Sequence, residues 1–153
     1  MKKSCIAGLL AMMMMLLAFG VRAEAAGWVT DFAQASKTAK KSGKYMLVDF
    51  SGSDWCGWCQ KLEAEVFSKP EFKQYAKKNL ICVLVDFPQS KYQSNDQKAK
   101  NQQLSTQYAI EGYPTVLILS PSGQLVATTG YQDGGALKYV NYLKQVISEH
   151  KRK

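Results

Sequence analysis

The sequence predicts a single α/β domain in which helices cover a mixed β-sheet. Short apolar runs that suit buried strands alternate with helical segments, and their order reduces to β-α-β-α-β-β-α. The chain has 153 residues, of which 46% are hydrophobic and 21% charged, without an internal repeat or low-complexity segment. This composition is typical of a soluble globular domain and excludes a disordered chain, a coiled coil and a polytopic membrane protein.

The first two elements follow from a capping signal and an apolar run. A helix is expected over residues 31–41, with Thr30 or Asp31 as its N-cap and Gly43 after its end. The apolar run 45–50 then predicts a buried strand.

The next helix is expected to begin near Cys56 and to end near Phe67. Residues 68–71 have the pattern of a capping box with proline in the first turn, which predicts a further helix over 71–78. The apolar run 80–87 predicts the second strand.

The second half of the chain begins with a polar segment, 88–100, which predicts a long exposed loop. A helix over 101–108 follows, and then two strands, 115–119 and 125–129, joined by the turn 121–123. The last helix is predicted by apolar residues at helical spacing, namely Ala136, Val140, Leu143 and Ile147.

Residues 1–25 have the three parts of a secretory signal peptide. Two lysines open it, the run 5–21 is nearly all apolar, and Ala23 and Ala25 each suit cleavage after them. The alternative is an uncleaved membrane anchor, because the apolar run approaches the roughly 20 residues that a spanning helix needs. We expect a protein that is secreted across the inner membrane to the periplasm, an oxidising compartment where thiols tend to pair.

The residues with the clearest chemistry are Cys56 and Cys59, three positions apart at a predicted helix start. Unpaired N–H groups and the helix dipole favour the Cys56 thiolate, lowering the pKa of a thiol from about 8.5 by one to several units in such pairs. A thiolate of this kind attacks disulfides. Cys59, one turn further along, is placed to resolve the mixed disulfide, so the pair itself is the redox group and no cofactor is expected.

Two other uses of the cysteine pair are less well supported. A structural zinc site needs four ligands, and the mature chain adds only Cys82 and His150, so no metal is expected. A purely structural disulfide is disfavoured because so short a loop contributes only about 2 kcal/mol. Cys82 lies in the predicted strand 80–87 and is expected to be a buried, inert thiol.

Three segments together resemble the thioredoxin fold: 48–50 with its acid, 55–59 with the two cysteines, and 112–115 with a proline before a strand. Residues 61–70 are similar to the thioredoxin-like family that includes the C-terminal domain of the disulfide-interchange protein DsbD. The resemblance implies a mixed central sheet with helices on both faces, formed by a domain over 26–150 and followed by a basic tail, 151–153.

The same resemblance implies roles for individual residues. Cys56 would attack and Cys59 would resolve, with Asp49 as a buried proton acceptor beneath Cys59. Pro114 would be a cis-proline facing the disulfide, and the backbone of Tyr113 would pair with a substrate peptide. The alternative for Asp49 is a polar residue on an edge strand.

The surroundings of the cysteines differ from those of thioredoxin itself. The loop 51–54 is one residue longer, and Gly57-Trp58 replaces the Gly-Pro of thioredoxin and the Gly-His of the isomerases, which leaves the direction of electron flow open. Trp55, Gly57 and Trp58 are expected to contact the substrate, with Trp58 pointing outward. The alternative for the tryptophans is ordinary packing, more so for Trp55.

We therefore expect an exported thiol–disulfide oxidoreductase that reduces cysteine-containing client proteins, with electrons from a membrane or periplasmic thiol donor. The alternatives are a disulfide-forming oxidase or isomerase, and a non-catalytic module that binds clients or copper. The net charge is +8, but the lysines lie in separate segments without a phosphate-binding loop, which predicts a solvated face and no nucleic-acid partner. A monomer is expected.

Overall fold

The computed structural model describes residues 27–152 and contains one mixed sheet of four strands in the order β2-β1-β3-β4. The second strand along the chain runs parallel to the first, and the third runs antiparallel to it. The strands are β1 (Tyr45–Ser51), β2 (Leu80–Asp86), β3 (Thr115–Leu119) and β4 (Leu125–Thr129).

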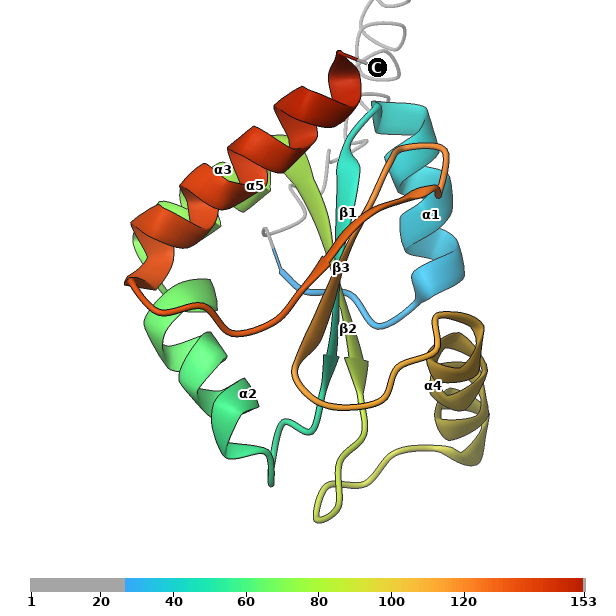
Figure 1. Cartoon of the computed structure of the whole chain (residues 1–153). Helices are drawn as coiled ribbons and strands as arrows, with labels where there is room; N and C mark the ends of the chain where they lie inside the picture. The colour runs from blue at the N-terminus through green and yellow to red at the C-terminus, as the bar shows by residue number, and fades with distance from the viewer. Residues whose placement is uncertain (1–26, 153) are drawn as a thin grey trace, which may run out of the picture.

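Helices cover both faces of the sheet, as the predicted fold requires (Figure 1). The first and fourth lie on one face, and the second, third and fifth lie on the other. They are α1 (Phe32–Ser42), α2 (Gly57–Leu62) with its continuation η1 (Glu63–Phe67), α3 (Pro70–Asn79), α4 (Asn95–Gln107) and α5 (Gly135–Lys151). Within residues 27–152, no helix is both long and apolar enough to cross a membrane.

The buried strand β1 divides the apolar interior into two clusters. Tyr45 and Leu47 join the cluster under α3 and α5, whereas Val48 and Phe50 join the cluster under α1. Successive side chains of a strand point to opposite faces, so Asp49 points to the same face as Tyr45 and Leu47. The only acid in β1 is thereby directed into the face that carries α2.

The expected loop over 88–100 is wrong in its second half, because α4 already begins at Asn95. The Ser94 side chain accepts a hydrogen bond from the Gln97 N–H, and Lys100 pairs with Asp96 at 2.7 Å. The segment 94–100 shows no apolar periodicity, because its residues are nearly all polar, and this is why the sequence does not predict the start of the helix. The helix begins there because the Ser94 side chain caps its first turn.

The caps of the other helices agree with the sequence in one case and differ in another. Asp31 caps α1 by accepting from the Gln34 N–H, as expected. The capping box before α3 is wrong, since Lys69 is the N-cap and the Ser68 hydroxyl donates to the Ala64 carbonyl at 3.1 Å.

The predictions for the two ends of the chain have different outcomes. The predicted basic tail begins at Lys151, which still belongs to α5, and Arg152 is the C-cap of that helix. The expected signal peptide, residues 1–25, lies outside the described residues.

Candidate active site

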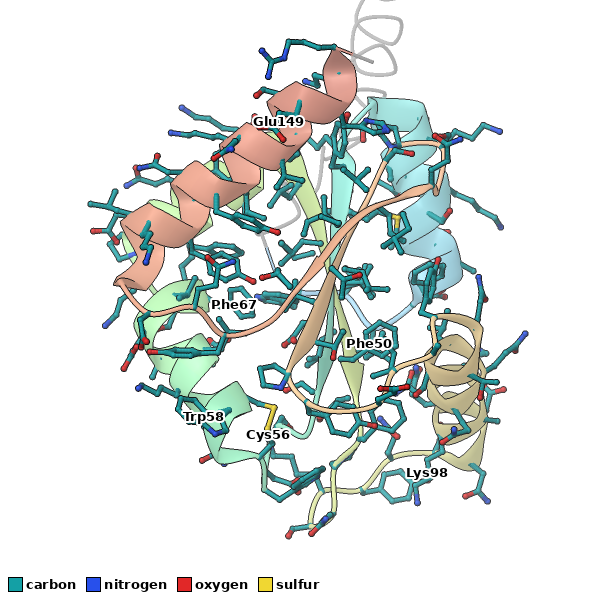
Figure 2. The ribbon with its side chains drawn as sticks, viewed as in Figure 1. Phe50, Cys56, Trp58, Phe67, Lys98 and Glu149 are labelled. Carbon is teal, nitrogen blue, oxygen red and sulfur yellow. A yellow bond between two sulfur atoms is a disulfide. The ribbon has the colours of Figure 1, made fainter. Side chains whose placement is uncertain are left out.

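A disulfide joins Cys56 and Cys59 at the start of α2, with their Cα atoms 5.3 Å apart (Figure 2). Cys56 is the N-cap, with extended backbone, and its Sγ accepts a hydrogen bond from the Cys59 N–H at 3.2 Å. Burial does not distinguish the two cysteines, which are 6% and 5% exposed. Their positions do, because only Cys56 precedes the helix and has its sulfur at the N–H groups of the first turn.

The helix after the disulfide is not uniform. It is α-helical to Leu62 and π-helical from Glu63 to Phe67, where Ser68 N–H donates to the Glu63 carbonyl at 2.9 Å. The sequence predicted one regular helix over this range, since periodicity cannot reveal a single wide turn. Wide turns of this type are frequent beside functional sites.

Asp49 lies on a central strand, paired with Leu84 on one side and Val116 on the other. The alternative of an edge position is therefore wrong. The side chain is 6% exposed, and its Oδ1 has no hydrogen-bond partner among the described residues. Burial raises the pKa of this carboxyl from 3.8 to about 7, and the negative charges of Glu63 and Asp86 add to the effect.

The peptide bond between Tyr113 and Pro114 is cis, as the resemblance implied. The Thr115 hydroxyl donates to the Gly112 carbonyl at 2.7 Å and stabilises the turn before β3. Gly130 passes close behind this turn, and a Cβ there would lie 2.9 Å from the Pro114 carbonyl oxygen. Only glycine fits at position 130 without displacing the cis-proline turn. A single glycine in the sequence gives no sign of this contact, because Gly130 is far from Pro114 along the chain.

Trp55 forms one wall beside the disulfide and is 43% exposed. Its indole Nε1 donates to the Phe87 carbonyl at 2.8 Å, and its ring meets Tyr113 edge-on at 5.8 Å. Phe87 and Tyr113 also contact each other, with centroids 5.2 Å apart. The Trp55 ring is therefore held in place by these contacts while part of it remains exposed to solvent.

Trp58 follows Cys56 by two residues and is 58% exposed, pointing outward as expected (Figure 2). Its ring contacts Tyr131 at 5.3 Å, and Lys61 Nζ lies 5.1 Å from the Trp58 centroid and 4.8 Å from that of Tyr131. The Tyr131 hydroxyl donates to Glu65. This cation–π and hydrogen-bonded cluster holds an exposed indole in place.

The loop before Cys56 is tied to the segment that follows β2. Asp54 accepts three backbone N–H groups, from residues 89–91, at 2.7–3.0 Å. Asp86 accepts from both the backbone and the hydroxyl of Ser53, at 2.9 and 2.6 Å. The hydrogen bonds to the backbone lower the pKa of Asp54, so the carboxylate stays ionised and the loop stays attached.

Cys82 is the free cysteine of the described chain and is half-buried on β2. Burial raises the pKa of its thiol to about 12. At neutral pH it remains protonated, which agrees with an inert thiol.

Sequence reasoning missed the residues that hold this site together. Gly130 and Tyr131 act on the site from outside the recognised segments, Lys61 lies within one of them but was given no role, and Asp54 and Asp86 were not singled out. Each has a partner far along the chain, so no local pattern identifies its contact. Of these residues, only Asp54 had a recognisable pattern in the sequence, because an acid within a loop of small polar residues often accepts hydrogen bonds from nearby backbone N–H groups.

Comparison with known proteins assigns this geometry to a family. A family model described as a thioredoxin-like domain matches residues 32–147. The disulfide bond reductase DsbH of Chlamydia pneumoniae is 36% identical over 116 residues, which is 76% of this chain and 70% of that protein.

Solved structures agree with the family assignment. A DsbH oxidoreductase superposes with a TM-score of 0.75 and is 35% identical, over 83% of this chain and 90% of that chain. The oxidised C-terminal domain of DsbD from Neisseria meningitidis has a TM-score of 0.55 at 20% identity, over 78% of this chain and 98% of that chain, a likeness of the fold alone. The chain belongs to the thioredoxin-like family and is a thiol–disulfide oxidoreductase.

Proposed function

We propose that this protein is an exported disulfide reductase, which transfers two electrons from the Cys56–Cys59 dithiol to disulfides in client proteins. The observation that carries the reducing direction is the 36% identity to a protein named as a disulfide bond reductase. The reduced pair would be regenerated by a membrane or periplasmic thiol donor. Export rests on the signal-peptide pattern of residues 1–25 and would be tested by the mass of the mature chain.

In the first step, the Cys56 thiolate attacks one sulfur of the client disulfide. A mixed disulfide forms with Cys56, and the other client sulfur leaves as a thiolate. The hydrogen bond from the Cys59 N–H to Cys56 Sγ supports this role, because a donor at 3.2 Å stabilises the thiolate more than the thiol.

In the second step, Cys59 attacks Cys56 Sγ and releases the second client sulfur, so that the protein ends as the disulfide and the client as the dithiol. Cys59 must lose a proton to attack. Asp49 is a suitable acceptor because its pKa of about 7 leaves a substantial fraction ionised at neutral pH while it still binds a proton readily.

The walls of the site would bind the client chain. Trp55 and Trp58 present partly exposed indoles next to the disulfide in the chain, and both are held by contacts to other aromatic rings. Gly57 lies between them in the sequence, and a Cβ there would meet nothing within 4 Å, so a client chain could approach the backbone at this position. The backbone beside the cis bond of Tyr113 and Pro114 would pair with an extended client segment.

The direction of transfer is tested by mixing stoichiometric protein with a peptide that carries one intramolecular disulfide. We expect the reduced protein to reduce most of the peptide, and the oxidised protein to leave the reduced peptide largely unchanged. Peptide thiols are counted by mass spectrometry after acid quenching. Cys56→Ser should abolish the exchange, and Cys82→Ser should leave it unchanged because that thiol remains protonated.

Two other outcomes would overturn the proposal. Quantitative formation of the peptide disulfide by the oxidised protein would identify an oxidase. If no thiol–disulfide exchange occurred in either direction, the protein would have to be a non-catalytic binding module.

A further inference from the structure

The end of the domain opposite the disulfide gathers cations from three helices. The C-terminal ends of α1, α3 and α5 meet there, next to the starts of β1 and β2 (Figure 1). The cations at this end, called the basic end below, are Lys40, Lys41, Lys44, Lys77, Lys78, Lys151 and Arg152. The sequence places them in separate segments, which is why it predicts only a solvated face.

Contacts around Tyr45 hold these segments together. Lys44 Nζ donates to the Lys77 carbonyl at 2.9 Å, which joins the start of β1 to the end of α3. The Tyr45 hydroxyl lies 2.8 Å from His150 Nδ1, and Lys151 Nζ lies 5.7 Å from the Tyr45 ring. The cations are thus fixed to one rigid corner of the fold rather than spread over mobile segments.

The positive charge of the basic end is largely unbalanced. Six of the seven cations are exposed and Lys44 is half-buried. The segments 40–45, 77–80 and 149–152 contain a single acid, Glu149. Each helix C-terminus supplies only about −0.5 of a charge, so three of them neutralise a small part of the total.

The opposite end of the domain carries charges of both signs. It holds the acids Asp54, Glu65, Asp86 and Asp133, together with the cations Lys61 beside Trp58 and Lys91 beside Ser53. The seven residues of β1 separate the two ends by about 20 Å. The unbalanced positive charge is therefore concentrated at the basic end, and the redox pair lies at the other end of the domain, as the positions of Glu149 and Cys56 in Figure 2 show.

The type of cation and one apolar neighbour favour lipid over a protein or nucleic acid. Six of the seven are lysines, which act as mobile point charges, whereas recognition of defined carboxylate or phosphate geometry favours arginine. Leu125, the first residue of β4, lies at the same end and is 54% exposed. Its position follows from the strand register, because Leu125 pairs with Leu119, and Leu119 pairs with Met46 near the start of β1. An exposed aliphatic side chain at the same end of the domain as the lysines suits the headgroup region of a bilayer.

We propose that the basic end docks on a membrane surface that carries anionic lipid headgroups. Docking in this orientation directs the Cys56–Cys59 pair away from the bilayer, toward clients in the aqueous phase. Each lysine near such a surface strengthens binding by about fivefold, so removal of three should weaken it by roughly a hundredfold. The proposal does not depend on the direction of electron transfer.

The test is co-sedimentation of the oxidised exported protein, purified after export with its mature mass recorded, with phosphatidylcholine vesicles prepared with and without phosphatidylglycerol. The variant Lys41→Gln/Lys78→Gln/Lys151→Gln removes one exposed charge from each of the three helices. The matched control Lys69→Gln/Lys98→Gln/Lys138→Gln removes three exposed lysines elsewhere. Every variant is exported and purified in the same way, and their measured masses show that all retain the same part of residues 1–26.

We expect the wild type to bind only vesicles that contain phosphatidylglycerol. Binding should weaken with added salt, because the Debye screening length falls from about 10 Å at 0.1 M to about 3 Å at 1 M. Of the two glutamine variants, only Lys41→Gln/Lys78→Gln/Lys151→Gln should lose binding. Lysine-to-arginine changes at residues 41, 78 and 151 should retain it. Melting temperatures of all variants identify any loss that comes from unfolding.

The bound protein also reports its orientation. Reduction of Cys56–Cys59 by dithiothreitol should proceed at the same rate on vesicles as in solution, and slower reduction on vesicles would overturn the proposed orientation. Equal loss of binding in both glutamine variants would overturn the assignment to the basic end. Binding to polyglutamate without binding to anionic vesicles would overturn the proposal of a membrane partner. It would indicate an acidic protein partner instead.

Discussion

Replacement of Cys59 by serine should stop turnover and leave client proteins covalently attached to Cys56. Without the second thiol, the mixed disulfide formed in the first step has no intramolecular nucleophile to release it. The wild-type pair resolves it because the two Cα atoms lie 5.3 Å apart, within reach of a closed disulfide. The adducts are measured by non-reducing electrophoresis and mass spectrometry after the reduced protein is mixed with disulfide-containing clients.

The controls for this trap change the other two cysteines of residues 27–152. Cys56→Ser should form no adduct, and Cys59→Ser/Cys82→Ser should form as much as Cys59→Ser alone. Adducts that persist without Cys56, or that disappear with Cys82, would contradict the assignment of the attacking thiol.

Asp49 should make the folded protein less stable as the pH rises from about 4 to about 7. The pKa of the carboxyl is 3.8 ordinarily and about 7 when buried, so across this range the folded state retains a proton that the unfolded chain has lost. Stability then falls with increasing pH, the reverse of the usual behaviour of a paired carboxylate. A pKa difference of about 3 corresponds to about 4 kcal/mol at most.

Asp49→Asn should therefore be more stable than the wild type above pH 7, and this advantage should shrink steadily toward pH 4. The measurement is denaturant unfolding of the oxidised proteins over that pH range. Asp96→Asn, at an exposed ion pair on α4, should follow the wild-type profile. A constant difference between wild type and Asp49→Asn across the range would show that the buried carboxyl does not titrate as described.

The elements of this fold that the sequence predicts are those with a local signal. The strands 45–50 and 115–119 are mainly apolar runs, and α1 has both its N-cap at Asp31 and its terminating Gly43. The position of the cysteine pair at a helix start follows from the same local pattern. Each of these features depends on neighbours within one element, which is why the chain alone reveals them.

The features that the sequence does not predict depend on distant pairs or on helices without an apolar stripe. The contact of Gly130 with Pro114 and the tyrosine that holds Trp58 join parts of the chain that only the fold brings together. The start of α4 at Asn95 is set by a polar cap within a uniformly polar segment. The basic end arises because three helices finish at the same edge of the sheet, a consequence of topology rather than of any one segment.

The equilibrium reduction potential of the Cys56–Cys59 pair tests the proposed direction of electron transfer most directly. It is measured in dithiothreitol or glutathione buffers, with the two redox states separated after thiol alkylation. A reductase fed by a thiol donor should have a potential near that of thioredoxin, about −270 mV. A value near about −120 mV, where strong disulfide-forming oxidants lie, would contradict the reductase and assign the protein to disulfide formation.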